Sequence, residues 1–308
     1  MDGSVMVFAP APVLTVTVEQ QADALELHLH PGGQGVWQAR MMVSLGADVT
    51  MCAAVGGEVG GVLTTLLAEE GVTLRTVAHE RGSGWYVHDR RDGRREEVAE
   101  DPGAPLVRHD LDELYNITLA EGLRASVCVL SGPAHPSVVD AEVYRRLAAD
   151  LTASDRRIVA DLSGDQLGAV LAGGVALVKV SHEELIADGR AEDDSRPQLI
   201  AAAEQLRADG AGSVLISRAD RPALALFEDR LVELQVPPLQ VADHRGAGDS
   251  MTAGVAAALA QGADLPTALR TGVAAGALNV TRHGLGTGRA DAIKALIDHV
   301  RLQPIDEG

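Results

Sequence analysis

The chain has 308 residues, 46% of them hydrophobic, and a formal net charge of −18 at pH 7. It is therefore a globular chain long enough to bury a large core, and its acidity argues against nucleic acid or an anionic membrane as a partner. Aromatic residues make up only 2% of the chain, which leaves no stacking platform for single-stranded nucleic acid.

The N-terminal part of the chain predicts short strands and no export signal. It lacks a charged segment followed by a long apolar run, and no segment of the chain is apolar enough to span a membrane, so we expect a cytoplasmic protein. Val5–Phe8 and Leu14–Val18 have strand composition and are separated by prolines. His28 and His30 have the spacing of one strand face, but no matching Cys or Asp cluster supports a metal there.

The segment from Thr73 to Ala99 shows no helical period. We predict the short strands Leu74–Ala78, Trp85–His88 and Arg95–Ala99, with a hairpin turn at Arg91–Arg94. Four arginines (Arg90, Arg91, Arg94 and Arg95) surround this turn, and we expect them to form its solvated tip.

From Asp110 onward, short apolar runs alternate with helix-like stretches. This alternation predicts βαβ units and a parallel sheet covered by helices. The predicted parallel strands are Val127–Leu130, Ile158–Asp161, Leu177–Lys179 and Val214–Ser217. A hairpin of Ala223–Phe227 and Leu231–Val236 follows, then helices from Ser250, Leu265 and Ala290. Ligands of such sheets bind beyond the carboxyl ends of the strands, where Ser131, Asp161 and Ser217 fall.

A glycine-rich turn, Gly246-Ala247-Gly248-Asp249, opens the helix that starts near Ser250. Small residues let the backbone approach a ligand, and the first free N–H groups of a helix bind anions. Asp249 stands at this anion site, where a carboxylate would repel phosphate unless it accepts a proton from an attacking hydroxyl. The alternative is an ordinary glycine turn with an acidic helix start, which the helix dipole also favours.

Five motifs in order resemble signatures of the ribokinase/PfkB carbohydrate kinase family, phosphofructokinase-like branch. They are Pro31-Gly32-Gly33-Gln34-Gly35 with Ala39-Arg40, Leu130-Ser131-Gly132, Asp161-Leu162-Ser163-Gly164, Lys179-Val180-Ser181-His182-Glu183-Glu184-Leu185, and Gly246-Ala247-Gly248-Asp249-Ser250 with Asp243 upstream. The likeness covers nearly the whole chain.

The resemblance implies an α/β ribokinase-like fold, a mostly parallel central sheet flanked by helices with a small β-sheet lid. It implies one kinase domain over residues 1–308, with lid strands within about 13–18 and 73–100 inserted as a small β lobe. It also implies transfer of the γ-phosphoryl group of ATP to a sugar hydroxyl, with Asp249 as the base and Gly246, Ala247 and Gly248 donating N–H groups to the phosphoryl.

The same resemblance assigns the nucleotide and metal side of the site. Glu184 matches the glutamate that helps hold Mg²⁺, while Ser181 replaces the asparagine of that motif. The expected cofactor-binding residues are Lys179, Ser181, Ser217, Asn279, Gly284 and Gly286. Two other interpretations stay open, because Ser181-x-x-Glu184 is also the pattern of a capped helix start and Lys179 could be a surface lysine.

The acceptor side departs from the family pattern. Its expected residues are Thr15, Gly32, Gly33, Gln34, Trp37 and Ser131, and Thr15 replaces the family's sugar-binding aspartate. Trp37 replaces the asparagine of the glycine motif and Gln34 its lysine, while Ser83-Gly84 replaces a phosphate-contacting Thr-Arg pair. Because these cationic groups are missing, we expect a weakly charged acceptor against Trp37 and poor use of ketohexose phosphates.

The sequence supports two hypotheses that belong to different classes of function. One is an ATP-dependent kinase that phosphorylates a sugar, sugar phosphate or related polyol. The other is a non-catalytic member of the same fold that binds a small ligand. Asp249 and its glycine loop favour the kinase, and the lost sugar ligands favour the binder or an unusual acceptor. The resemblance also implies a homodimer formed through the lid.

Overall fold

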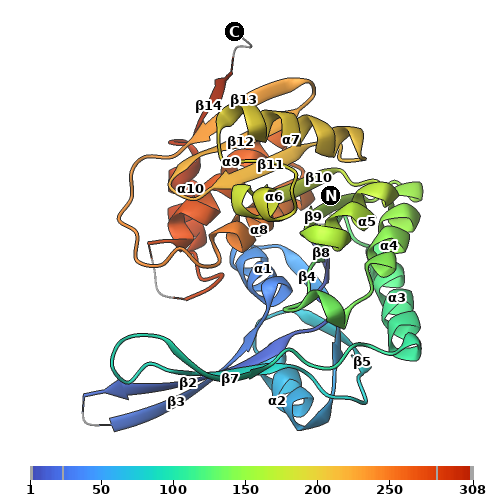
Figure 1. The fold of residues 1–308 in the computed structure, drawn as a ribbon, viewed down its shortest axis with the longest axis vertical. Helices are drawn as coiled ribbons and strands as arrows, with labels where there is room; N and C mark the ends of the chain where they lie inside the picture. Colours follow the sequence, from blue (N-terminus) through green and yellow to red (C-terminus); the bar gives the residue numbers. More distant parts are fainter. Residues whose placement is uncertain (1–2, 23, 282–283, 306–308) are drawn as a thin grey trace.

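The computed structural model describes residues 3–22, 24–281 and 284–305. Two β-sheets organise it, a large central sheet between two layers of helices and a small sheet that protrudes from one side of this body (Figure 1). The predicted mostly parallel sheet with flanking helices and a small second sheet is therefore confirmed. No helix in the described part of the chain is both long and apolar enough to cross a membrane.

The central sheet has ten strands, and seven adjacent ones run parallel. In spatial order the strands are β14 (Arg301–Pro304), β13 (Arg230–Gln235), β12 (Arg221–Phe227), β11 (Val214–Arg218), β10 (Leu177–Ser181), β9 (Arg157–Asp161), β8 (Val127–Ser131), β1 (Ser4–Phe8), β4 (Asp48–Val55) and β5 (Thr73–Ala78). Because helices cover both faces, strands such as β8 are buried at every position and carry continuous apolar runs.

The helices divide between two buried apolar clusters, one on each face of the sheet. The first cluster includes α1 (Gln34–Ser44), α2 (Gly57–Ala68), α8 (Ala247–Ala260), α9 (Leu265–Asn279) and α10 (Ala290–Ile297). The second includes α3 (Arg108–Gly122), α4 (Ala141–Ala153), α5 (Gly164–Gly173), α6 (His182–Ala187), α7 (Arg196–Ala208) and a 3₁₀ turn at Pro136–Val138. Cys52 and Cys128 are buried free thiols.

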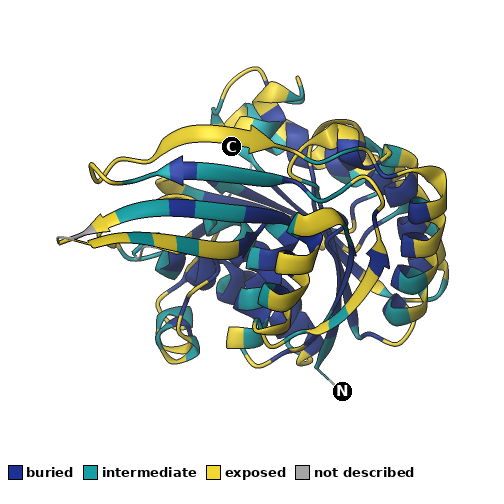
Figure 2. Cartoon of the chain, turned by 90° about the horizontal axis from the view of Figure 1, so that it is seen from below, coloured by how far each residue is buried: buried dark blue, intermediate teal, exposed yellow. Residues whose placement is uncertain are grey.

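The small sheet forms the lid, in the order β3 (Ala24–Gly32), β2 (Val13–Gln21), β6 (Trp85–Asp89) and β7 (Glu96–Asp101). In β3 exposed and half-buried positions alternate from Leu25 to Leu29, and β7 is exposed along its whole length (Figure 2). A thin sheet that stands away from the core has this pattern, because only part of each strand packs against anything.

One predicted strand lies in the other sheet, and two strands were not predicted. The strand at Leu74–Ala78 was predicted as part of the lid, but β5 pairs in parallel with β4 and closes the central sheet. Its place in the lid is taken by β3, a strand whose alternating polar and exposed apolar residues gave no run of β-branched positions. The segment after α10 contains a strand that was not predicted, because β14 pairs with β13 at the other edge of the central sheet.

Candidate active site

The glycine loop before α8 has the geometry of an anion site. Gly246 caps the helix with a φ of 70°, a left-handed conformation that favours glycine. A Cβ built on Gly248 would lie 2.4 Å from the Nζ of Lys179, so a larger residue there would displace the ammonium group from the loop. The N–H groups of the first turn of α8 and the Lys179 cation thus meet at one place, where they can stabilise negative charge.

Asp249 lies in the first turn of α8 and is partly exposed. Burial and the nearby carboxylate of Asp161 raise its pKa to about 7, while Lys179 and a hydrogen bond with Gln34 act in the opposite direction. A carboxylate with a pKa near neutrality can accept a proton and release it again, which a general base requires.

A buried hydrogen-bond network supports this loop from below. The carboxylate of Asp161, at the end of β9, accepts hydrogen bonds from Gln38 Nε2 (2.9 Å), Thr252 Oγ1 (2.7 Å) and Lys179 Nζ (3.2 Å). Ser131 Oγ in turn donates to Gln38 Oε1 at 2.5 Å. Asp161 is paired in register with Ser131 of β8 and with Lys179 of β10, which is why these side chains meet.

Lys179 is a buried cation rather than a surface lysine. It is 5% exposed, and burial alone would lower its pKa, but the carboxylates of Asp161, Glu184 and Asp249 outweigh this and raise the pKa to about 12. Burial raises the pKa of Asp161, whereas Lys179 and the Thr252 hydroxyl act to lower it. Three carboxylates therefore surround one ammonium group, which leaves the site with an excess of negative charge.

Ser181 and Glu184 form the capping box that was one of the two interpretations left open. Ser181 Oγ accepts a hydrogen bond from the Glu184 backbone N–H (3.1 Å), and Glu184 Oε2 accepts one from the Ser181 N–H (2.7 Å). Glu184 also lines a large hollow beside the glycine loop, so the cap holds its carboxylate at the site. Ser217 lies near the end of β11 opposite Ser181, and its carbonyl accepts from the His182 ring at 3.3 Å.

Asn279 links the glycine loop to the loop that follows α9. It is 1% exposed; its Nδ2 donates to the carbonyl of Arg245 (2.7 Å), and its Oδ1 accepts from the Gly286 N–H (3.2 Å). A Cβ on Gly286 would lie 2.3 Å from the carbonyl oxygen of Trp37, so this loop also packs directly on α1. Gly284 lines the hollow under the lid. Asn279 therefore holds both loops in place.

Two adjoining hollows lie on the two sides of Trp37 and Tyr86, which line both. The larger, of about 1060 Å³, includes Gly33, Gln34, Asp161 and Glu184. The smaller, of about 580 Å³, lies against the polar face of the lid and includes Thr15. Of the remaining predicted acceptor residues, Gly32 packs on Thr15 and Tyr86, and Ser131 is fully buried within the network below.

Of the four hairpin arginines that were predicted to be solvated, Arg91, Arg94 and Arg95 are exposed and Arg90 is half-buried. Arg90 and Arg95 also line the smaller hollow. The two lid strands that flank the hairpin turn extend over the site, so the residues at the base of the turn lie beside the hollow. Cationic side chains therefore line the hollow under the lid, although Gln34 and Gly84 stand at the motif positions.

Several site residues were missed from the sequence. Gln38 lies on the buried face of α1 with no exposed surface, and Thr252 lies on the buried face of α8. A glutamine among apolar residues at helical spacing is a signal for Gln38, because buried amides need partners. Tyr86 and Arg245 carried no such signal, since their role depends on how the lid meets the glycine loop.

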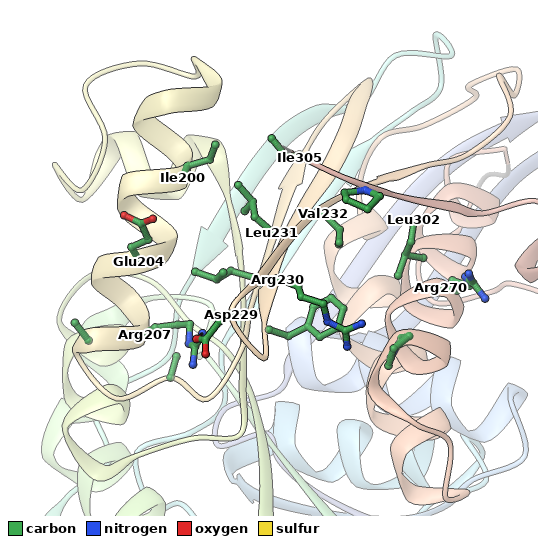
Figure 3. A pocket seen from close by; sticks show the side chains of 16 residues that line it. Ile200, Glu204, Arg207, Asp229, Arg230, Leu231, Val232, Arg270, Leu302 and Ile305 are labelled. Carbon is green, nitrogen blue, oxygen red and sulfur yellow. Dashed lines mark hydrogen bonds and ion pairs between the residues drawn. The ribbon is translucent and has the colours of Figure 1, made fainter. Parts of the chain in front are cut away.

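A further hollow, of about 990 Å³, lies away from the glycine loop, between α7, the β12–β13 hairpin, β14 and α9 (Figure 3). Its side chains include Ile200, Leu231 and Ile305 together with Arg207 and Arg270. None of the predicted site residues lines it. It therefore lies outside the candidate active site.

Comparison with known proteins supports the same assignment. The profile of the pfkB family carbohydrate kinases matches residues 3–292. The chain is 32% identical to the ATP-dependent 6-phosphofructokinase isozyme 2 of Escherichia coli, over 82% of each chain, and 26% identical to the 1-phosphofructokinase of Bacillus subtilis, over 89% and 88%. The crystal structure of Escherichia coli phosphofructokinase-2 with potassium superposes with a TM-score of 0.84 at 27% identity, over 96% of this chain and 98% of that one.

Proposed function

The chain belongs to the pfkB family of carbohydrate kinases, and from this premise we propose that it transfers the γ-phosphoryl group of ATP, in the presence of Mg²⁺, to a hydroxyl of a sugar-like acceptor in the hollows beside Asp249. The related Escherichia coli and Bacillus subtilis kinases act on fructose phosphates by name, which makes a sugar phosphate a reasonable acceptor to test first. The comparisons give no support to a non-catalytic binder.

One observation carries the proposal. Asp249, with a pKa of about 7, lies at the anion site formed by Gly246, Ala247, Gly248 and the buried Lys179. A carboxylate in this position would accept the proton of the acceptor hydroxyl as that oxygen attacks phosphorus. The N–H groups of the loop would stabilise the charge on the transferring phosphoryl group.

The chain's residues fit the two groups that the reaction needs. ATP would supply the phosphoryl group and Mg²⁺ would offset its charge. Glu184 fits a role at the metal, because it lines the hollow and a carboxylate oxygen is a preferred ligand of Mg²⁺. Lys179 and Ser217 lie near the carboxyl ends of the adjacent strands β10 and β11 and would bound the nucleotide together with the Gly284–Gly286 loop.

The lid offers a surface for a second copy of the chain. On the face opposite His28 and His30, Leu25 and Leu27 are 65% and 64% exposed. Apolar residues in a row on one sheet face are typical of a protein–protein contact. The Escherichia coli phosphofructokinase-2 has a tetrameric inhibited form, so assembly occurs in a similar chain. We infer a homodimer through this lid face.

The test is turnover of ATP against a panel of sugars, sugar phosphates and polyols, with Asp249→Asn beside the wild type. We expect the variant to fold and bind ATP but to lose roughly 10²–10⁴-fold in rate, the usual contribution of a general base. A variant that keeps more than about a tenth of the wild-type rate would exclude Asp249 as the base, since this loss is less than such a base contributes.

A further inference from the structure

Helix α1 carries two glutamines one turn apart, Gln34 and Gln38. Residues four positions apart lie on the same face of a helix. Gln38 has no exposed surface, and Gln34 is half-buried and lines the larger hollow, so this face of α1 is turned toward the strand ends of the central sheet. Two amide groups are therefore placed beside the carboxylates of the site.

The oxygens of both amides are held by the end of β8. The Gly132 N–H donates to Gln34 Oε1 at 2.6 Å, and Ser131 Oγ donates to Gln38 Oε1 at 2.5 Å. A backbone N–H can only donate, so it fixes which end of the Gln34 amide is the oxygen. The amide nitrogen of each glutamine is therefore turned away from β8.

The nitrogens of the two amides face two carboxylates. Gln38 Nε2 donates to Asp161 Oδ2 at 2.9 Å. Gln34 forms a hydrogen bond with Asp249, and this contact acts to lower the pKa of that carboxyl. Because the Gln34 oxygen is engaged by Gly132 and an ionised carboxylate only accepts, the amide nitrogen is the donor to Asp249. The two glutamines thus repeat one arrangement, in which an amide joins the end of β8 to a carboxylate.

The charges around Asp249 show what a neutral donor does there. Burial raises the pKa of Asp249 first, Asp161 of β9 and Glu184 of α6 raise it further, and Lys179 of β10 opposes them. The Lys179 ammonium group is itself hydrogen-bonded to Asp161 at 3.2 Å. Gln34 adds a hydrogen bond to Asp249 without adding a charge.

A lysine would act differently at this position. The family motif has a lysine where this chain has Gln34. A second ammonium group beside Asp249 would favour the ionised carboxylate strongly and lower its pKa further. Glutamine keeps the donor and omits the charge, so the carboxylate can be held in place and still exchange a proton near neutral pH.

From this arrangement we propose that Gln34 is a positioning residue of the reaction: Gly132 holds its amide oxygen, and its amide nitrogen holds the Asp249 carboxylate toward the acceptor hydroxyl. The inference rests on the proposed kinase function and adds a residue that orients its base. Gln34 then acts through Asp249 and does not itself hold the acceptor. Trp37, on the same helix, lines both hollows, so α1 both bounds the acceptor and orients the base.

The experiment measures kcat, KM and the pH dependence of kcat/KM with the best acceptor of the panel, for Gln34→Met and Gln34→Lys. Methionine has a similar length but no hydrogen-bonding group. In Gln34→Met we expect kcat to fall about tenfold, less than on loss of the base itself, with little change in the KM of the acceptor. The pH at which kcat/KM falls on the acid side should rise by about one unit, because the lost hydrogen bond favoured the ionised base. In Gln34→Lys it should fall by about one unit, because the added cation favours the ionised base.

The matched control is Gln166→Met. Gln166 lines the same hollow and is 6% exposed, and its Nε2 donates to the Val139 carbonyl at 3.1 Å. This variant also loses an amide, but not the one that contacts Asp249, so its acid-side pH dependence should match that of the wild type. An equal displacement in Gln166→Met would overturn the inference, since any lost amide in the hollow would then act alike. A raised KM with an unchanged pH dependence in both Gln34 variants would also overturn it, and would make Gln34 a ligand of the acceptor.

The titration of Asp249 decides the inference if no acceptor is phosphorylated and the proposed function fails. The pKa is then measured by nuclear magnetic resonance on protein labelled with ¹³C-aspartate, with the Asp249 signal assigned by its loss in Asp249→Asn. We expect the pKa of Asp249 to be about one unit higher in Gln34→Met and about one unit lower in Gln34→Lys than in the wild type. Gln34→Lys carries the residue of the family motif and decides the question if Gln34→Met does not fold. An Asp249 pKa that is the same in the wild type and in the folded Gln34 variants would overturn the inference whatever the activity.

Discussion

In the proposed reaction the glycine loop and the lid act on the same ligand, but their charged groups are arranged in opposite ways. Below the loop, Asp161 and Lys179 are almost completely buried and each is hydrogen-bonded to a partner in the core. On the lid, Arg95 contacts His88 and the ring of Tyr86, and His88 Nδ1 has no hydrogen-bond partner among the described residues. We therefore expect the core to position the reacting groups and the lid, which packs little against the core, to determine the choice of acceptor.

The geometry of the two regions explains this contrast. The central sheet is covered on both sides, so polar groups at its strand ends must satisfy one another. The lid has one polar face toward the site and one apolar face away from it, and β7 is exposed throughout. Substitutions on the lid cost little stability, and new binding residues can be accommodated there. Departures from the family pattern at Gly84 and Trp37 lie on this side of the molecule.

The largest effect is expected from breaking the buried ion pair. Lys179→Met leaves Asp161 as an uncompensated buried charge, which costs roughly 3–5 kcal/mol of unfolding free energy in such sites. Urea unfolding followed by circular dichroism measures it. The double variant Asp161→Asn with Lys179→Met should recover much of this stability without recovering activity. If the single variant is as stable as the wild type, the charges are not coupled as described.

The pH dependence of activity tests the site next. Burial and Asp161 raise the pKa of Asp249 to about 7, and a base must be ionised to act. We expect kcat/KM to rise about tenfold per pH unit below that value and to level off above it. The unfolding free energy should change in the opposite direction. The native state binds the Asp249 proton more tightly than the unfolded chain does, in which the pKa of an Asp is about 3.9. The contribution of Asp249 to the unfolding free energy therefore falls as the pH rises between about 4 and 7. A pH-rate profile that is flat between about pH 5 and 8 would contradict this assignment.

A smaller change is expected at the capped carboxylate. Glu184→Gln keeps a hydrogen-bonding side chain at the helix start but removes the charge, so the Mg²⁺ concentration for half-maximal rate should rise severalfold while the Tm changes little. Glu183→Gln is the matched control, because Glu183 is the exposed neighbour in the same turn. Identical Mg²⁺ titrations for both variants would remove Glu184 from the metal site.

The smallest effect on folding is expected on the outer face of the lid. Leu27→Asp replaces a 64% exposed side chain, so the unfolding free energy of the protomer should change by no more than about 0.5 kcal/mol. The same change should dissociate the proposed homodimer, which light scattering after size-exclusion chromatography measures. Leu123→Asp, an exposed leucine at the end of α3, should leave the assembly unchanged. A Leu27→Asp protein that remains dimeric would exclude this lid face as the interface.

The sequence by itself determined the fold class and the reacting loop. Apolar runs separated by helical stretches specify a parallel sheet, and Gly246–Asp249 before an alanine-rich helix specifies an anion site with a carboxylate. These features are local, since spacing along the chain already places the residues relative to one another. The strand ends at Ser131, Asp161 and Ser217 were predicted for the same reason.

Only the tertiary structure showed which residues far apart in the chain contact one another. Gln38 and Thr252 meet Asp161 because α1 and α8 pack on the ends of β8 and β9, a contact between residues up to 123 positions apart. Strand β5 joins the central sheet, and Arg95 returns from the hairpin to the site, because pairing between strands sets their neighbours. Such pairings depend on how distant faces bury one another, which local periodicity does not specify.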